Sequence, residues 1–258
     1  MKVCLAQYDI VWEDKAANMS RCRRFFEEAS QQGGELILFP EMSLTGFSMD
    51  ASLAEPPDGE SCTFFGGLSQ QYGIPCVFGY AERDGEKLYN RLAFADSSGV
   101  ISARYTKLHP FSMGGESCFT AGEETVCFPL GGMDIGLSIC YDLRFPELYQ
   151  RLSISCGAVV VAANFPASRR EHWLTLLRAR AIENQCYMLG CNRTGFGGGI
   201  EYSGDSAVFA PDGELICTAE SAEKLLTADI DISAVQELRA AFPLKNDRRI
   251  EIYRNFYE

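Results

Sequence analysis

Three residues of types used in hydrolysis, Glu41, Lys107 and Cys140, are far apart in this chain of 258 residues, yet each follows a strand-like segment. Cys140 ends an apolar run and precedes a polar turn and Pro146, a residue that suits the first turn of a helix. A thiol at such a strand-to-helix turn projects outward, beside backbone N–H groups that can hold an oxyanion. The positive end of the helix dipole is expected to lower the pKa of this thiol, which makes Cys140 a candidate nucleophile. The alternative is that Cys140 is a small core residue, the usual place of a free cysteine.

A thiol nucleophile needs a base to take its proton, and two charged residues have suitable positions. Glu41 follows a buried-looking strand and Pro40, which ends strand pairing and puts the carboxylate at the carboxyl end of the strand, where α/β folds assemble sites. Lys107 ends a predicted hairpin arm in the same way. Taken alone, each is more often a solvated strand end. His109 and His172, the two histidines of the chain, keep a cysteine–histidine pair as an alternative.

The segments that carry these residues alternate between strands and helices. The clearest helix is predicted over 169–185, because Ser168 and Glu171 have the spacing of a capping box. Two stretches, 89–105 and 206–220, contain a turn signal between β-rich arms and are predicted to be antiparallel hairpins. Hairpins mixed with alternating strands and helices predict an α/β layered sandwich rather than a purely parallel, doubly wound sheet.

The composition predicts a single domain over residues 1–258. Of these residues 47% are hydrophobic and 22% are charged, as in an ordinary globular core, and no stretch has the composition of a linker. The last part, 234–258, is charged and aromatic and is expected to be a C-terminal arm. It would pack either on a neighbouring molecule or back on its own domain.

Charge and cysteine content restrict the partners that the chain is expected to have. A net charge of −12 without a cluster of lysine or arginine argues against nucleic acid. The N-terminal segment lacks the features of a signal peptide, and no apolar run approaches membrane-spanning length, so a membrane partner is not expected. Eleven cysteines without a C-x-x-C pair predict reduced thiols in the cytoplasm, and only two histidines argue against a metal site.

Three segments are similar to motifs of the nitrilase superfamily, the carbon–nitrogen hydrolases, in that family's order and with its typical spacing. They are ELILFPEMSLTGF around Glu41, RYTKLHPF around Lys107 and GLSICYDLRFPELYQ around Cys140. The similarity continues from Val3 to about Asp231. This resemblance implies a four-layer α-β-β-α sandwich and, because family members usually pair through their outer helices, a homodimer.

The same resemblance implies a role for each motif residue. Glu41 would be the general base and Cys140 the nucleophile. Lys107 would stabilise the tetrahedral intermediate together with the backbone N–H of Tyr141. The implied reaction needs no cofactor: the thiolate attacks an amide carbonyl, ammonia leaves, and water releases the acid from a thioester.

A second glutamate near the cysteine is a further feature of many family members. The matching candidate is Glu116, in the glycine-containing loop after Lys107, with Glu123 and Glu124 as alternatives. Several charges around one thiol would set its proton affinity together, so that a carboxylate can act where a histidine usually does.

Within the superfamily, the segments CYDLRFPELYQ, NFPASRREHW and ARAIENQCY are similar to the ω-amidases, which hydrolyse the terminal amide of α-ketoglutaramate and α-ketosuccinamate. Such a substrate needs a cation for its far carboxylate, and Arg144 matches the arginine position of those enzymes. The alternative for Arg144 is an ion pair with Asp142 or Glu147 across the turn. Phe47 and Phe165 are expected to form walls of the pocket.

Other functions are compatible with the same residues. The motif residues could act on an N-carbamoyl amine, a nitrile or a deaminated-glutathione-type amide. A non-catalytic scaffold of the same fold and a thiol redox sensor are further alternatives. The glycine-rich segment 195–199 lacks the flanking residues of a phosphate loop and is expected to be a mobile loop near the site.

Overall fold

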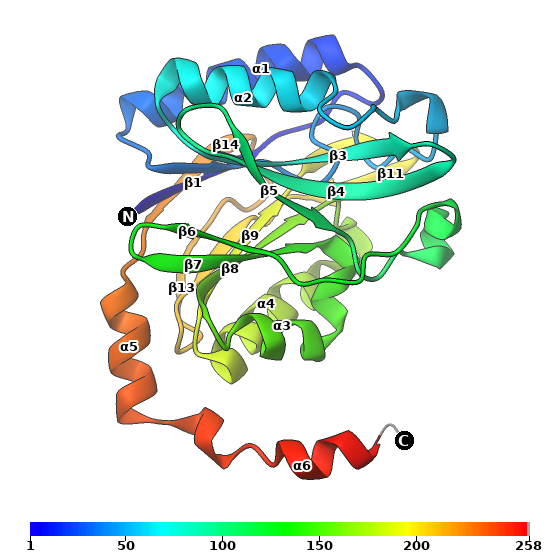
Figure 1. Ribbon diagram of the computed structural model, residues 1–258. Helices are drawn as coiled ribbons and strands as arrows, with labels where there is room; N and C mark the ends of the chain where they lie inside the picture. Colours follow the sequence, from blue (N-terminus) through cyan, green and yellow to red (C-terminus); the bar gives the residue numbers. More distant parts are fainter. Residues whose placement is uncertain (257–258) are drawn as a thin grey trace.

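The computed structural model describes residues 1–256, in which two six-stranded sheets pack face to face between two outer layers of helices (Figure 1). The first sheet has the order β14-β1-β2-β3-β4-β5, and its strands are β1 (Lys2–Gln7), β2 (Leu36–Leu38), β3 (Cys76–Asp84), β4 (Lys87–Ala95), β5 (Ile101–Thr106) and β14 (Lys224–Asp229). The second sheet has the order β13-β12-β9-β8-β7-β6, and its strands are β6 (Cys127–Leu130), β7 (Met133–Ile139), β8 (Cys156–Ala163), β9 (Tyr187–Asn192), β12 (Ala207–Phe209) and β13 (Leu215–Thr218). This arrangement confirms the predicted four-layer α/β sandwich.

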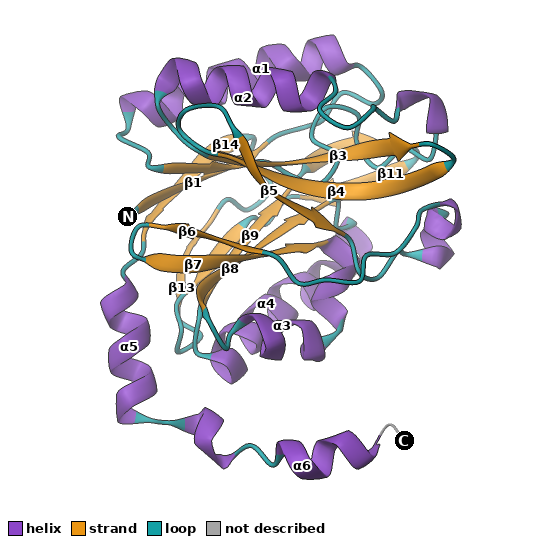
Figure 2. Cartoon of the chain, in the orientation of Figure 1, coloured by secondary structure: helices purple, strands orange, loops and turns teal. Residues whose placement is uncertain are grey.

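Helices form the outer layers on both sides of the sandwich (Figure 2). Helices α1 (Lys15–Gln31) and α2 (Glu60–Tyr72) cover the first sheet, and α3 (Pro146–Leu152) and α4 (Arg170–Asn184) cover the second. The capping box predicted for the last of these helices is wrong. Its N-cap is Arg169, which makes no side-chain capping hydrogen bond, because a 3₁₀ turn over Ala167–Arg169 precedes the α-helix.

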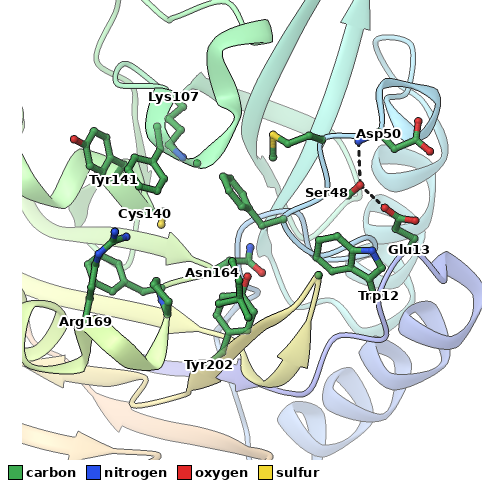
Figure 3. A pocket seen from close by; sticks show the side chains of 18 of the residues that line it. Trp12, Glu13, Ser48, Asp50, Lys107, Cys140, Tyr141, Asn164, Arg169 and Tyr202 are labelled. Atoms are coloured by element: carbon green, nitrogen blue, oxygen red, sulfur yellow. Dashed lines mark hydrogen bonds between the residues drawn. The ribbon is translucent and has the colours of Figure 1, made fainter.

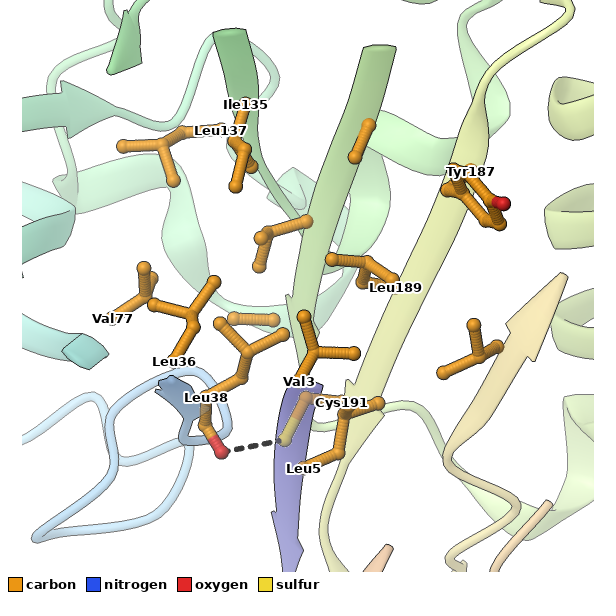
Figure 4. Close-up of a cluster of buried hydrophobic side chains, with 14 of the residues drawn as sticks. Val3, Leu5, Leu36, Leu38, Val77, Ile135, Leu137, Tyr187, Leu189 and Cys191 are labelled. Atoms are coloured by element: carbon orange, nitrogen blue, oxygen red, sulfur yellow. Dashed lines mark hydrogen bonds between the residues drawn. The ribbon is translucent and has the colours of Figure 1, made fainter. Parts of the chain in front are cut away.

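The core between the sheets follows from the alternation of side chains along the strands. On β1, Val3 and Leu5 point toward the second sheet, whereas Cys4 and Ala6 pack against the helical layer. On β8 both faces are covered, so the whole strand is buried. Figure 4 shows Val3 and Leu5 with side chains from both sheets. Burial of each such aliphatic side chain contributes about 1.5–3 kcal/mol to stability.

Both predicted hairpins are confirmed as β4–β5 and β12–β13. The segment 195–199, expected to be a loop, lies instead in a hairpin of β10 (Thr194–Gly197) and β11 (Ile200–Ser203). Gly198 and Gly199 form its turn with φ of 57° and 81°, in the left-handed region that favours glycine.

The strand order brings several carboxyl ends to one side of the sandwich. Strands β2 and β3 are parallel, and β5 is antiparallel to β4, which is antiparallel to β3, so β2 and β5 end on the same side of their sheet. In the second sheet β7 and β8 are parallel. Glu41, Lys107, Cys140 and Asn164 all follow these ends, which is why residues far apart in the sequence meet there.

The C-terminal segment leaves the sandwich through α5 (Ile232–Ala241) and continues to the short helix α6 (Ile250–Tyr253) (Figure 1). Its cations contact the ends of α3, α4 and β8: Lys245 donates to Ser153 O after α3, and Arg239 donates to Gln185 O after α4 at 3.0 Å and to Cys156 O at the start of β8 at 2.9 Å. Residues 257–258 of the expected arm lie outside the described residues. No helix within residues 1–256 is both long and apolar enough to span a membrane.

Candidate active site

Cys140 lies at a strained junction between β7 and a 3₁₀ helix, η4 (Cys140–Arg144). Its φ of 44° is in the left-handed region, which costs a non-glycine residue about 1–3 kcal/mol. The carboxylate of Asp142 holds this turn by accepting the N–H of Ile139 at 2.9 Å. It also accepts the Tyr105 hydroxyl at 2.8 Å and the His109 backbone N–H at 3.0 Å, which joins the cysteine turn to the segment around Lys107.

The pKa of the Cys140 thiol is raised, contrary to the lowering expected from a helix N-terminus. Burial is the main cause, and the Glu41 carboxylate raises the pKa further, while the Lys107 ammonium lowers it. The helix that starts at Pro146 is too far along the chain to dominate, because η4 separates it from the thiol. The resting cysteine is therefore a thiol, and its attack requires a base.

Lys107 is buried between two carboxylates. Its Nζ lies 2.8 Å from Glu41 Oε1 and 2.6 Å from Glu116 Oε2, and both glutamates are fully buried. Burial lowers the pKa of Lys107, but the two carboxylates outweigh it and leave that pKa raised. The pKa of Glu116 is also raised, mainly by burial, although Lys107 lowers it. Lys107 is thus held as an ammonium ion.

Two asparagines complete the hydrogen bonds of these carboxylates. Asn90, in the middle of β4, donates from Nδ2 to Glu41 Oε1 at 2.8 Å and to Glu116 Oε1 at 2.7 Å. Asn164, directly after β8, donates its backbone N–H to Glu41 Oε2 at 3.0 Å and its Nδ2 to the Glu41 carbonyl at 2.6 Å. The same Asn164 backbone N–H also hydrogen-bonds the Cys140 thiol, which lowers the pKa of that thiol. Glu41 Oε2 and the thiol therefore share one donor.

A glycine on the neighbouring strand lets the Glu41 backbone approach this closely. A Cβ at Gly79 would lie 2.6 Å from Met42 N and 2.8 Å from Glu41 Cα. The Ser43 hydroxyl, which donates to Pro40 O at 2.6 Å, accepts the Gly79 N–H at 3.0 Å. These contacts fix the turn that carries Glu41 against β3.

The thiol opens on a cavity of about 390 Å³ (Figure 3). The cavity is lined by six of the residues predicted for the site: Lys107, Cys140, Tyr141, Arg144, Phe47 and Phe165. Glu41 and Glu116 are buried beside Lys107 and do not line it.

The aromatic residues of the cavity contact its cations. The Lys107 Nζ lies 5.4 Å from the centroid of the Phe47 ring. The Arg144 guanidinium lies 5.4 Å from the ring centroid of Phe165 and 5.9 Å from that of Tyr141. Asp142, one of the two carboxylates considered as a partner for Arg144, is instead occupied by the cysteine turn and His109.

Several lining or supporting residues were missed by the sequence analysis. Asn164 follows a strand end as Glu41 does, so the same rule could have found it. Asn90 lies within a strand, where no turn or strand end marks it. Arg169, Trp12 and Tyr202 also line the cavity, and no spacing in the sequence connects them to Cys140.

An α-β-β-α sandwich with a thiol, a buried lysine and a carboxylate at its strand ends defines a class of hydrolases. Similarity to known proteins identifies the family. Residues 2–240 match the carbon-nitrogen hydrolase family model. The chain belongs to this family, which confirms the predicted membership in the nitrilase superfamily. It is a hydrolase of carbon–nitrogen bonds other than peptide bonds.

Similar proteins include amidases. The 2-oxoglutaramate amidase of Bacillus subtilis is 33% identical over 97% of this chain and 98% of its own length. The omega-amidase YafV of Escherichia coli K12 is 35% identical over 96% of both chains. A CN-hydrolase superfamily protein of Xanthomonas campestris, with an arsenic adduct in its active site, has a TM-score of 0.91 and 32% identity, covering 96% of this chain and 97% of that one. These similarities support the amidase class.

Proposed function

We propose that this protein hydrolyses the terminal amide of small ω-amido dicarboxylates, such as α-ketoglutaramate and α-ketosuccinamate, to the acid and ammonia. The observation that carries the proposal is that the Arg144 guanidinium lines the same cavity as the Cys140 thiol. A guanidinium binds a carboxylate through two parallel hydrogen bonds, so it suits the far end of such a substrate. The similarity to a 2-oxoglutaramate amidase and an omega-amidase supports the same substrate class.

The acylation step uses Glu41 as the base. Because the pKa of the thiol is raised, its proton must move to Glu41 as the sulfur attacks the amide carbonyl. The S–C bond forms while the carbonyl π electrons move to oxygen, and Lys107 and the Tyr141 N–H stabilise the oxyanion. The C–N bond then breaks, the Glu41 carboxyl returns its proton to nitrogen, and ammonia leaves a thioester on Cys140.

The deacylation step repeats this sequence with water. Glu41 takes a proton from the attacking water, the C–O bond forms, and the C–S bond breaks as the proton returns to sulfur. Glu116 has a distinct role here. When Glu41 is protonated, Glu116 remains as the counter-ion of Lys107 at 2.6 Å, so the lysine keeps the charge that stabilises the oxyanion.

The experiment compares Arg144→Ala with the wild type by ammonia release from α-ketoglutaramate and from a neutral amide of similar length, pentanamide. Loss of a charge-assisted bidentate contact is expected to lower kcat/KM for α-ketoglutaramate about 10–100-fold. The rate with pentanamide should stay within about threefold, because pentanamide has no carboxylate. Arg178→Ala, an exposed arginine on α4 outside the cavity, is the matched control. Equal loss on both substrates would contradict the carboxylate role.

We also propose a homodimer, a single domain over 1–258 with the arm 234–258, and a cytoplasmic location. Exposed apolar side chains in the arm, with Phe242 60% and Phe256 68% exposed, support a protein contact there. Each of the eleven cysteines, all within the described residues, is a free thiol, as is usual in a reducing compartment. Light scattering tests the oligomer, and a monomer mass would contradict it.

A further inference from the structure

A second arginine, Arg169, lines the cavity and has no role in the reaction as described above. It lies at the N-cap of α4, where the helix dipole disfavours a cation. Its guanidinium lies 5.3 Å from the centroid of the Phe111 ring. The positive charge of Arg169 at this helix end therefore lowers stability, and the contact with Phe111 is its compensating interaction. A bound anionic ligand would explain why a cation is placed here.

Arg169 and Arg144 each contact one ring of the same aromatic pair. The Phe111 and Tyr141 ring centroids are 4.7 Å apart, with Arg169 on Phe111 and Arg144 near Tyr141. Neither arginine belongs to an ion pair among residues 1–256, in contrast to Arg170, which lies 2.8 Å from Asp205. Lys107, the other cation of the cavity, is already neutralised by two glutamates.

The acidic residues of the cavity lie on its opposite wall (Figure 3). Glu13 accepts the Ser48 hydroxyl at 2.5 Å, and Asp50 accepts the Ser52 N–H at 2.8 Å. The cavity thus has two guanidinium groups without an ion pair within residues 1–256 on the side of Tyr141, and the carboxylates of Glu13 and Asp50 on the other side. The Arg144 guanidinium also contacts His172 Nδ1 at 3.4 Å.

We propose that Arg169 is a specificity-determining residue that acts with Arg144 as a clamp for the 2-oxo acid end of the substrate. This inference rests on the proposed function. Arg144 binds the carboxylate, and Arg169 donates to the 2-oxo oxygen or shares the carboxylate. A 2-amino acid amide of the same length has an ammonium group in place of the oxo group, and two guanidinium groups repel it. The enzyme thereby selects 2-oxo acid amides against 2-amino acid amides.

Three substrates of equal length separate these effects, because they differ only at C2: α-ketoglutaramate has an oxo group, L-glutamine has an ammonium group and glutaramate has two hydrogens. Ammonia release gives kcat/KM for each with the wild type, Arg169→Gln, Arg169→Lys and the control Arg178→Gln. In Arg169→Gln the ratio of kcat/KM for α-ketoglutaramate to that for glutamine should fall at least about tenfold. Arg169→Lys keeps the charge and should retain most of the rejection of glutamine.

The outcomes distinguish this inference from the proposed function. A wild type that releases no ammonia from α-ketoglutaramate, while it cleaves other amides, contradicts the proposed function itself. If the wild type cleaves α-ketoglutaramate, but Arg169→Gln lowers kcat/KM equally for all three substrates or changes it for none, only the clamp is overturned. A fall in the ratio with Arg178→Gln as well would also overturn it, since a general effect of net charge would then explain the result.

Discussion

Two clusters of lysine and glutamate lie within residues 1–256, and only the one around Lys107 opens on the cavity. In the first, Lys107 lies between Glu41 and Glu116, and all three side chains are at most 1% exposed. In the second, Glu55 accepts Lys15 Nζ at 2.7 Å, the Ser61 hydroxyl at 2.7 Å and the Ser61 N–H at 2.6 Å. The Lys15 side chain is 20% exposed, and the thiol near this cluster, Cys62, is buried and does not line the cavity.

Each lysine contacts two glutamates, and the clusters differ in the burial of the second acid and in access to the cavity. Glu55 precedes α2 and caps its start through the Ser61 N–H, and its Lys15 pair joins that helix to α1. The second acid of this cluster, Glu60, lies 3.6 Å from Lys15 Nζ and is 58% exposed. In the Lys107 cluster both acids are fully buried. Burial raises the pKa of the adjacent Cys140 thiol most, and the two carboxylates raise it further, while Lys107 lowers it. A buried ion pair alone is therefore weak evidence of catalysis. The strained thiol, the second buried carboxylate and the cavity make the Lys107 cluster a candidate site.

The largest effect that separates the clusters is expected for Cys140→Ser. This change should lower ammonia release at least about 10³-fold, because a serine hydroxyl is a far weaker nucleophile at neutral pH. The fold should be retained, since one buried polar atom replaces another. Ammonia release and the urea midpoint of unfolding check both parts. Retained turnover would refute the assignment of the nucleophile.

The sequence predicted the layers and the strand-end residues, because hydrophobic alternation and strand boundaries are local signals. It could not show that one lysine contacts two glutamates, since Lys107 and Glu41 are 66 positions apart in the chain. Asn90 was missed because its two hydrogen bonds depend on how β4 lies between Glu41 and Glu116.

Two wrong predictions have physical causes. The pKa direction of Cys140 was wrong because burial and a nearby carboxylate outweigh the helix dipole. The capping box was wrong because a 3₁₀ turn takes Ser168 out of the N-cap position. Both depend on three-dimensional surroundings that spacing does not report.

Gly79→Ala should disturb the Lys107 cluster without touching its charges. The new Cβ would lie within 3 Å of the Glu41 backbone, so the turn must shift and the base moves away from the thiol. Such overpacking costs about 1–3 kcal/mol of stability, and misplacement of the base should lower kcat about 10–100-fold. Gly67→Ala in α2, where a Cβ meets nothing within 4 Å, is the control and should leave kcat unchanged. Normal kcat in Gly79→Ala would show that Glu41 tolerates this shift.

Glu55→Gln tests the other cluster, with the opposite pattern of effects. Loss of the Lys15 pair and weaker capping of α2 should lower the free energy of unfolding by about 1–3 kcal/mol. The Lys107 cluster shares no partner with Glu55, so kcat/KM should stay within about twofold. Urea unfolding and ammonia release measure the two quantities. A fall in kcat/KM without loss of stability would break the distinction between the clusters.

The smallest effect, and the most specific to the Lys107 cluster, is a shift in the reactivity of the thiol. The Glu116 carboxylate raises the pKa of Cys140, because like charges disfavour the thiolate. Glu116→Gln removes that charge, so the pKa of Cys140 should fall and its alkylation by iodoacetamide should rise at lower pH. The Cys140 peptide is followed by mass spectrometry, since Cys118 and Cys127 are exposed and also react. Glu55→Gln should leave this pH curve unmoved. A Glu116→Gln curve that is unchanged, or that moves to higher pH, would mean that the second buried carboxylate does not control the thiol.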